Sequence, residues 1–399
     1  MREAVIVDAV RTPLARGKDN GRLHGWHPVD LGAAPLAALV ERTGVDPESI
    51  EDVVMGCVMQ TGEQGVNVGR NAAIVAGYPE TTPATTVDRQ CGSSQQAAHF
   101  AAQGVIAGAY DVVVAGGVES MSRVPMGVTA SQGPGFPMGS TLFAKYSEEN
   151  LYGKGGIVPQ GISAEIIAEK WGLTREELDE FSAESHKRAA RATEEGRYDN
   201  EMITVEVRDE NGQPTGEKIT RDEGIRPDST VEKLAGLNPS FDPNGVITAA
   251  NSSQITDGAA ALLIMEREKA ESLGLKPRAR FHTFALAGVD PVIMLTGPIP
   301  ATASALEKSG LTMDDIDVFE VNEAFAPVVL AWQREFNADL DKTNINGGAI
   351  ALGHPLGASG ARLMTTMLNE LERTGGRYGL QTMCEGGGMA NATIIERLD

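Results

Sequence analysis

The chain of 399 residues is 41% hydrophobic and 22% charged, the composition of a folded protein long enough for two core-forming units. Its formal net charge of −21 argues against a nucleic-acid partner, because phosphate binding needs a clustered basic face that this sequence lacks. No stretch approaches the roughly 18 apolar residues of a membrane span, and the first residues lack the apolar core of a signal peptide. We therefore expect a cytoplasmic protein that does not insert into membranes.

Three elements of the N-terminal part reappear, in the same order, in the C-terminal part. Each copy has a glycine followed by an acidic turn and a strand, then a helix that opens with small residues, then a strand that ends in glycines. The paired segments are 44–54 with 310–320, 91–108 with 354–368, and 111–119 with 378–388. The sequence therefore predicts a duplicated α/β unit.

A different kind of sequence lies between the two copies. It opens with a Gly/Pro/Ser/Met-rich stretch at 121–140, which predicts a long covering loop without a regular element. The segment 173–196 predicts a solvated helix that starts with Thr174 and Glu177 at capping-box spacing, and 208–218 predicts a surface hairpin. The predicted division is an N-terminal half at 1–120, an inserted loop domain at 121–250, the end of the N-terminal half at 251–275 and a C-terminal half at 276–399.

The three cysteines, Cys57, Cys91 and Cys384, are too few and too odd in number for a disulfide framework, and no CxxC spacing indicates a metal site. Cys91 follows a strand-like segment at the first turn of a helix, where the helix dipole is expected to lower its pKa from the free value of about 8.5. Gly92 and Ser93 beside it leave the sulfur open to a substrate, which favours a nucleophile over a buried structural cysteine. Cys57 lacks such surroundings and is expected in the core.

His354 lies in a glycine-rich segment that runs into a helix, which allows close contact with a ligand. The duplication places it at the counterpart of the Cys91 helix start, so two helix N-termini are expected to face one centre, as a cysteine–histidine pair requires. Cys384 ends a strand and precedes three glycines, 386–388, whose amides are suited to bind an oxyanion. A thiol placed beside a reacting carbon can also transfer its proton.

A polar pair, Asn322 and Glu323, ends an apolar strand in the C-terminal copy. Such a pair can simply cap the following helix. Its expected place at the carboxyl edge of a sheet, where α/β sites gather, favours a functional role.

Four motifs in family order make the chain resemble the thiolases over its whole length. They are CGSS at 91–94, NEAF at 322–325, GGAIALGHPLGASGAR at 347–362 and CEGGG at 384–388. The resemblance implies an α/β fold of two similar halves, each a mixed five-stranded sheet, stacked in α-β-α-β-α layers with an inserted loop domain. It also implies a homodimer or homotetramer, with a partner subunit of a β-oxidation complex as an open alternative.

The resemblance implies a reaction that makes or breaks the carbon–carbon bond of a 3-ketoacyl-CoA. Cys91 would become acylated, His354 would activate it, and Cys384 would transfer the proton of the α-carbon. His354 and a water held by Asn322 would form one oxyanion hole, and the backbone amides of Cys91 and Gly386 would form the other. CoA is then a substrate of a ping-pong reaction, and no metal or other cofactor is implied.

The resemblance further assigns six residues to the binding of CoA and its acyl group. They are Arg226 near the nucleotide, Phe241 and Ala249 along the pantetheine arm, Ser253 hydrogen-bonded to that arm, and Met294 and Phe325 around the acyl group. Arg226 would thus give an acidic protein the local positive charge that an anionic substrate needs.

One departure from the family pattern bears on the substrate. Short-chain biosynthetic thiolases carry a His-Met pair where this chain has Pro159 and Gln160. This favours a degradative enzyme for longer acyl groups, such as fatty-acid or steroid side chains. Condensation of two acetyl-CoA molecules remains an alternative. A decarboxylating ketoacyl synthase is disfavoured because such enzymes lack a second cysteine at the position of Cys384. A non-catalytic thiolase-like scaffold would be expected to lose one of the three reactive residues.

Overall fold

The computed structural model describes residues 2–146 and 156–399. Ten strands form one mixed sheet in the order β4-β3-β5-β8-β1-β9-β12-β11-β10, with the short β2 paired to β8. The strands are β1 Ala4–Arg11, β2 Ala15–Arg16, β3 Asp52–Gly56, β4 Ala84–Val87, β5 Val112–Ser120, β8 Thr256–Glu266, β9 Ala279–Gly288, β10 Val318–Val321, β11 Tyr378–Glu385 and β12 Met389–Arg397.

The sheet consists of two half-sheets that meet at β1 and β9. These two strands pair only through Val5 with Arg280 and Ile6 with Ala279. The N-terminal half-sheet has five main strands, whereas the C-terminal one has four, and its fifth position is a single parallel bridge between Phe319 and Thr343. β3 in the N-terminal half and β10 in the C-terminal half pair in parallel with their neighbours. The remaining strands of each half pair antiparallel, which agrees with the predicted mixed sheets.

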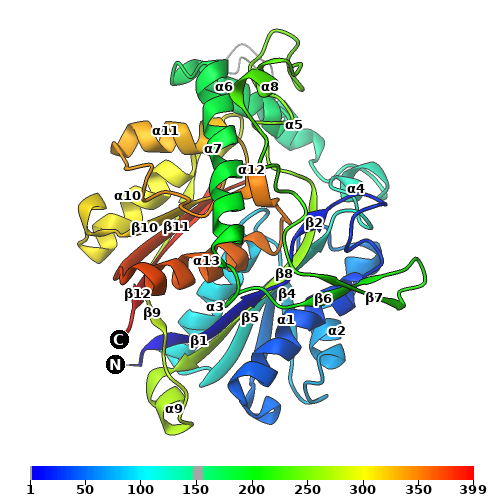
Figure 1. The fold of residues 1–399 in the computed structure, drawn as a ribbon, viewed down its shortest axis with the longest axis vertical. Helices are drawn as coiled ribbons and strands as arrows, with labels where there is room; N and C mark the ends of the chain where they lie inside the picture. Colours follow the sequence, from blue (N-terminus) through cyan, green and yellow to red (C-terminus); the bar gives the residue numbers. More distant parts are fainter. Residues whose placement is uncertain (1, 147–155) are drawn as a thin grey trace.

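Helices cover the half-sheets on both faces, and two helices lie between them (Figure 1). The outer helices are α1 Pro28–Thr43, α2 Val68–Val75, α10 Pro298–Ser309 and α11 Ala326–Phe336, and the inner helices are α3 Ser93–Ala107 and α13 Ser359–Thr374. Separate apolar clusters fill the outer N-terminal, central and outer C-terminal layers. The predicted α-β-α-β-α layering is therefore confirmed. The short helices α9 Arg267–Ser272 and α12 Ala349–Leu352 complete the two halves.

The duplication is visible in the register of the two half-sheets. A glycine in the left-handed conformation ends the helix before each acidic turn, Gly44 with φ 69° and Gly310 with φ 73°. The same spacing then separates the first residues of β3 and β10 and those of α3 and α13. At this spacing the counterpart of Cys91 is Gly357 and that of His354 is Asp88. The predicted correspondence of the two helix starts is confirmed, but Cys91 and His354 are not equivalent positions within it.

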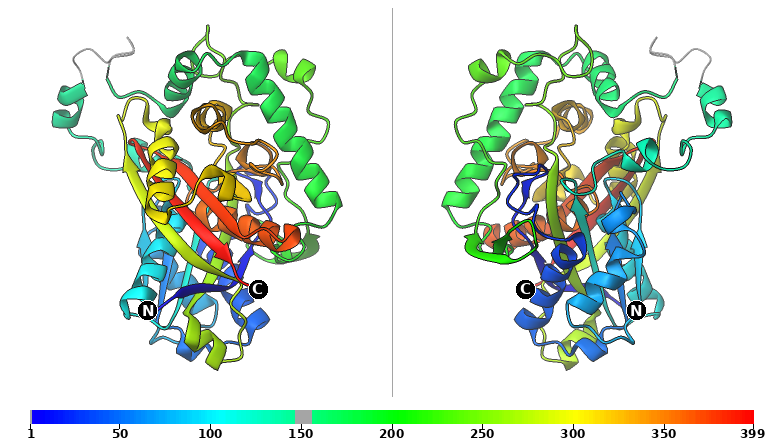
Figure 2. Two further views of the ribbon diagram at one scale, coloured as in Figure 1. Left: turned by 90° about the vertical axis from the view of Figure 1, so that its left-hand side faces the viewer. Right: turned by 90° about the vertical axis from the view of Figure 1, so that its right-hand side faces the viewer.

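The inserted segment lies between β5 and β8. Its elements are α4 Val128–Ser131, α5 Ser140–Tyr146, α6 Gln160–Lys170, α7 Arg175–Glu194, β6 Val205–Arg208, β7 Pro214–Ile219 and α8 Val231–Ala235. The capping box of α7 and the β6–β7 hairpin are confirmed. The expectation of no regular element in 121–140 is wrong at α4, where a single helical turn starts after Gly127 at φ 83°. Figure 1 and Figure 2 show α5, α6 and α8 at the end of the molecule away from the chain termini, and the β6–β7 hairpin lower down, on the side of α1.

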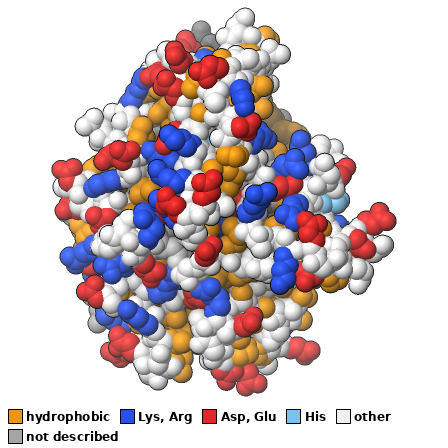
Figure 3. All heavy atoms as spheres, in the orientation of Figure 1, with side chains coloured by type: hydrophobic (Ala, Val, Ile, Leu, Met, Phe, Trp, Pro, Cys, Tyr) orange, Lys and Arg blue, Asp and Glu red, His pale blue; other side chains and the backbone are white. Residues whose placement is uncertain are grey.

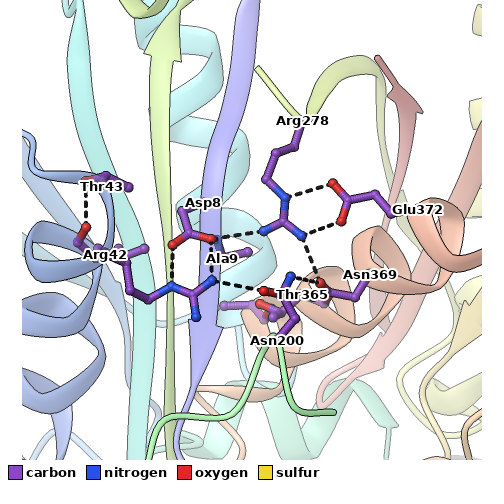
Figure 4. Close-up of polar contacts among 11 residues, drawn as sticks. Asp8, Ala9, Arg42, Thr43, Asn200, Arg278, Thr365, Asn369 and Glu372 are labelled. Carbon is purple, nitrogen blue, oxygen red and sulfur yellow. Dashed lines mark hydrogen bonds and ion pairs between the residues drawn. The ribbon is translucent and has the colours of Figure 1, made fainter. Parts of the chain in front are cut away.

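Ion pairs tie the halves together beside the β1–β9 joint (Figure 4). Asp8 on β1 accepts hydrogen bonds from Arg42 (2.7 Å) and Arg278 (3.0 Å). Arg278 also bonds to Glu372 (2.6 Å) and Asn369 (2.8 Å) on α13. Acidic and basic side chains are likewise interspersed on the face of the molecule drawn in Figure 3. Among the residues described, no helix is long and apolar enough to cross a membrane.

Candidate active site

The turn that carries Cys91 lies between β4 and α3 and is fixed by its own groups. Ser93 Oγ accepts a hydrogen bond from Arg89 N (2.9 Å) and donates one to Gln90 O (2.6 Å). Gln90 adopts φ 47°, a left-handed conformation that non-glycine residues seldom take. The chain thus bends sharply just before the sulfur, which stands beside the first turn of α3 as predicted.

Cys91 is buried, contrary to the expectation of an open sulfur. It is 5% exposed and packs in a cluster with Val58, Met59, Met121, Val124, Leu356, Leu363 and Met383. Burial, and then the nearby Glu385, raise the pKa of Cys91 to about 12, although hydrogen bonds from the amides of Cys91 and Gly386 act in the opposite direction. The expected lowering of the Cys91 pKa is therefore wrong, because the loss of hydration outweighs the effect of the helix terminus. The thiol needs a base to ionise.

His354 lies between α12 and α13, and Ser359 sets its tautomer. Ser359 Oγ donates its one hydrogen to Pro355 O (2.8 Å). It therefore accepts in its contact with His354 Nδ1 (2.6 Å), so Nδ1 carries the ring proton. Nε2 is then free of a proton, and Asn322 Nδ2 lies 3.4 Å from it. Burial, and then the charge of Arg362, lower the pKa of His354 to about 3. The neutral ring has the free lone pair that a general base requires.

The N-terminal turns of α3 and α13 touch, which brings the Cys91 and His354 segments together. Ser94 Oγ accepts a hydrogen bond from Ala361 N (2.9 Å). Gly360 lies so close to α3 that a Cβ on it would be 2.2 Å from Gln95 N. Leu356, which follows the histidine segment, packs in the apolar cluster of Cys91. The two helix starts therefore lie side by side, as the sequence predicted.

Cys384 lies on β11, beside the Cys91 turn. The strand ends at Glu385, and the next amide, that of Gly386, bonds to the sulfur of Cys91. Burial, and then the interaction with Cys91, raise the pKa of Cys384 well above its ordinary value. A buried thiol of this kind holds its proton until a stronger base forms beside it.

Asn322 and Glu323 point to different surroundings. Asn322 lies beside His354, and its Oδ1 is a buried acceptor without a protein partner among the described residues. Glu323 accepts hydrogen bonds from Ser185 (2.7 Å), Asn344 (3.0 Å) and the amide of Ile350 (3.1 Å). Neither side chain caps α11. Asn322 thus belongs to the site, whereas Glu323 supports the segment that leads to the histidine.

Four of the six residues assigned to the substrate lie near the cysteines. Met294 and Phe325 share an apolar cluster with Cys384. The ring of Phe241 meets that of Phe325 edge-on, with 5.9 Å between the centroids. Ser253 donates its amide hydrogen to the carbonyl of Ala324 (2.9 Å), the residue before Phe325.

Arg226 and Ala249 lie further out on the surface. Both are exposed, and the amide of Arg226 bonds to the ring of His186 (3.1 Å). No contact in the described residues joins Arg226 to the reactive cysteines. Its position agrees with a role at the outer end of a long ligand, not at the reacting carbon.

A largely apolar cavity of about 460 Å³ opens beside Gly386. Its lining residues are Gln90, Met138, Leu142, Ile157, Val158, Pro159, Gln160, Pro291, Met294, Gly386 and Gly387. Met294 is the only expected acyl-pocket residue in this lining, since Phe325 lies outside it. Pro159 and Gln160, which depart from the short-chain pattern, both line it. The inserted segment therefore supplies most of the wall of the space next to Cys91.

Sequence reasoning missed three residues of the site. Glu119 is buried at the end of β5 and accepts hydrogen bonds from the amides of Val58, Met59 and Gly357 (2.9, 3.1 and 2.8 Å). Ser359 fixes the histidine ring, and Glu385 lies buried beside the cysteine turn. The sequence does indicate the two glutamates, because each lies at the end of an apolar strand. A carboxylate at such a position is rarely buried without a role.

Comparisons with known proteins agree with this geometry. The profile for the thiolase N-terminal domain matches residues 4–268, and the profile for the thiolase C-terminal domain matches 275–397. The chain belongs to the thiolase family of acyltransferases. The steroid 3-ketoacyl-CoA thiolase FadA6 of Mycobacterium tuberculosis is 53% identical, covering 100% of this chain and 95% of that protein. The 3-ketoacyl-CoA thiolase of Aliivibrio fischeri is 46% identical over the full length of both.

Solved thiolase structures share the fold over the whole chain. The acetyl-CoA acetyltransferase of Bacillus anthracis has a TM-score of 0.88 at 38% identity, covering 100% of this chain and 99% of that one. Human mitochondrial 3-ketoacyl-CoA thiolase in complex with CoA has a TM-score of 0.87 at 35% identity, covering 100% and 98%. The family and fold predicted from the four motifs are therefore confirmed for this thiolase.

Proposed function

We propose that this thiolase cleaves 3-ketoacyl-CoA with CoA to give acetyl-CoA and a shortened acyl-CoA. The observation that carries the proposal is the neutral Cys91 thiol, with the amide of Gly386 bonded to its sulfur, on a helix start packed against that of the His354 segment. The names of the relatives from M. tuberculosis and A. fischeri support the same reaction.

The first half-reaction forms an acyl-enzyme. His354 Nε2 takes the proton of Cys91 while the sulfur attacks the 3-keto carbon, and the amides of Cys91 and Gly386 hold the oxyanion. The bond between C2 and C3 then breaks, which leaves the acyl group on Cys91 and an acetyl-CoA enolate. His354 and a water on Asn322 stabilise the enolate oxygen, and Cys384 gives its proton to the α-carbon.

The second half-reaction returns the enzyme to its first state. The Cys384 thiolate takes the proton of an incoming CoA thiol, whose sulfur attacks the acyl group on Cys91. The Cys91 sulfur leaves and regains its proton from His354. Protons and charges balance, and the reaction requires no cofactor other than its CoA substrate. The raised pKa of Cys384 supports this role, because such a thiolate is a strong base once formed.

The cavity beside Gly386 supports a preference for acyl groups longer than acetoacetyl. Its volume of about 460 Å³ and its apolar lining suit an extended or branched hydrocarbon. CoA would enter past Phe241, Ala249 and Ser253, with its nucleotide near Arg226. Condensation of two acetyl-CoA molecules is the second candidate, supported by the likeness to the acetyl-CoA acetyltransferase of B. anthracis.

The proposed assembly is a homodimer or homotetramer in the cytoplasm. Support comes from β4, which is an unpaired edge of the sheet, and from exposed apolar side chains on the same half such as Val66, Val75 and Phe100. A β-oxidation partner subunit remains a further proposal. Light scattering of the purified chain tests the assembly.

Intact mass spectrometry tests the reaction. Mixing the enzyme with a 3-ketoacyl-CoA in the absence of free CoA should add one acyl group, which peptide mapping should find on Cys91, and Cys91→Ala should stay unmodified. An unmodified wild-type chain would refute the proposal and favour a non-catalytic scaffold. Thiolysis rates for acetoacetyl-CoA against long-chain and steroid side-chain 3-ketoacyl-CoA then separate the two candidate substrates.

A further inference from the structure

Glu385 is a buried carboxyl beside Cys91 that the mechanism does not use. It is 0% exposed, and neither of its oxygens has a hydrogen-bond partner among the described residues. Its counterpart in the N-terminal half, Glu119, occupies the same position at the end of β5 and accepts three backbone amides. One carboxyl of the duplicated pair is thus fully bonded, whereas the other is left bare beside the nucleophile. A buried bare carboxylate is costly, so this difference calls for a physical reason.

The Glu385 carboxyl fills the space in which a side chain of residue 92 would start. A Cβ on Gly92 would lie 2.0 Å from Glu385 Oε1 and 2.8 Å from Asn391 Nδ2. Asn391 Nδ2 also donates to the carbonyl of Gly92 (3.1 Å). Glu385 and Asn391 therefore require a glycine at position 92. Together these two side chains of the C-terminal half pack against the Cys91 turn and support it.

We propose that Glu385 is a positioning residue that supports the Cys91 turn as a neutral carboxylic acid and whose ionisation opposes formation of the Cys91 thiolate. No hydrogen-bond donor among the described residues meets its oxygens, so the uncharged form is the one that this site accommodates. The proposal concerns the cysteine alone and does not depend on which acyl-CoA the enzyme uses.

The charged groups that act on Glu385 leave its ionisation within reach of experiment. Burial raises the pKa of Glu385 to about 8, with Arg89 lowering it and Asp88 raising it. Cys91 and Cys384 are the other titratable groups beside it, and Glu119 also acts on Cys91. Below about pH 8 Glu385 is neutral, and above it the new negative charge raises the pKa of Cys91.

Alkylation of Cys91 by iodoacetamide, followed by peptide mass spectrometry, measures thiolate formation without any CoA substrate. The rate for Glu385→Gln divided by the wild-type rate should rise from low to high pH by about tenfold, the effect of one like charge shifting a pKa by about one unit. Any constant factor from the new amide cancels in this comparison. The control is Glu320→Gln, since burial also raises the pKa of Glu320 to about 8 but Glu320 lies on β10. Its ratio should not change with pH.

A ratio that stays flat from about pH 6.5 to 9.5 for Glu385→Gln would overturn the proposal, as would an equal rise for Glu320→Gln. If Glu385→Gln does not fold, the wild type decides alone. Its logarithmic rate should climb with pH, flatten near pH 8 as Glu385 ionises, and climb again. A straight line through that region overturns the proposal. Because no acyl transfer is measured, a failure here leaves the test of the thiolysis reaction untouched.

Discussion

Replacing Ser359 by alanine should slow acyl transfer while leaving the thiolase folded. Ser359 Oγ is the acceptor that holds the proton on His354 Nδ1 and keeps Nε2 free, with a donor–acceptor distance of 2.6 Å inside a buried site. Without it the Nδ1–H is a buried donor with no acceptor, which costs about 1–3 kcal/mol. The ring then favours the other tautomer, whose Nε2 cannot accept the Cys91 proton. We expect kcat for thiolysis to fall about 10- to 100-fold with little change in KM.

Ser182→Ala is the matched control. Ser182 is also a buried helical serine that bonds to a carbonyl four residues earlier, Leu178 O at 2.6 Å, as Ser359 does to Pro355 O. Within the described part of the chain, its hydroxyl has no hydrogen bond to a group of the site. Steady-state kinetics and thermal unfolding of both variants separate a catalytic from a structural effect. Unchanged kcat in Ser359→Ala, or an equal loss in Ser182→Ala, would show that the tautomer is not set in this way.

Three further predictions test the fold and the substrate channel. Asp8→Ala leaves two arginines of the half-sheet joint without their carboxylate, so the free energy of unfolding measured in urea should fall by about 3 kcal/mol. Asp228→Ala, which removes an exposed ion pair, is the control and should leave it almost unchanged. Burial lowers the pKa of His99 to about 3 from 6.5, so between these two pH values the unfolded chain binds a proton that the folded protein does not, and stability is lost as pH falls from 6.5 towards 3. His99→Gln should therefore reduce the acid slope of the unfolding free energy in this window by about 1.4 kcal/mol per pH unit, and an unchanged slope contradicts the assignment. Phe241→Ala removes a half-exposed ring beside Phe325, so KM for CoA thioesters should rise about tenfold with kcat preserved, and a loss confined to kcat would place the ring elsewhere.

The duplicated architecture could be predicted because local sequence patterns determine it. The glycine that ends a helix, the acidic turn and the apolar strand recur with one spacing, and each is decided by residues close in the chain. The same holds for the capping box of α7. The fifth strand of the C-terminal half could not be predicted from local pattern, since Thr343 meets Phe319 through a single bridge that tertiary packing sets.

The protonation states at the site could not be predicted, for a different reason. The sequence showed Cys91 at a helix start, and the dipole of that start favours a thiolate. The opposing effect comes from side chains far away in the chain, such as Met383 and Leu363, which exclude water from the sulfur only after folding. Desolvation depends on all the neighbours of a group at once, so a local motif predicts where a cysteine lies but not the pKa of its thiol.

Each half of the molecule supports the reactive segment of the other. Glu119 of the N-terminal half holds the amide of Gly357, in the loop that carries His354. Glu385 and Asn391 of the C-terminal half lie under the turn that carries Cys91. The two equivalent carboxyls differ in their bonding, because no hydrogen-bond donor among the described residues meets the oxygens of Glu385, whereas the amide of Gly386 beside it bonds to the sulfur of Cys91. Neither half alone can form the site, so the reaction requires both copies, which are also joined through their shared sheet.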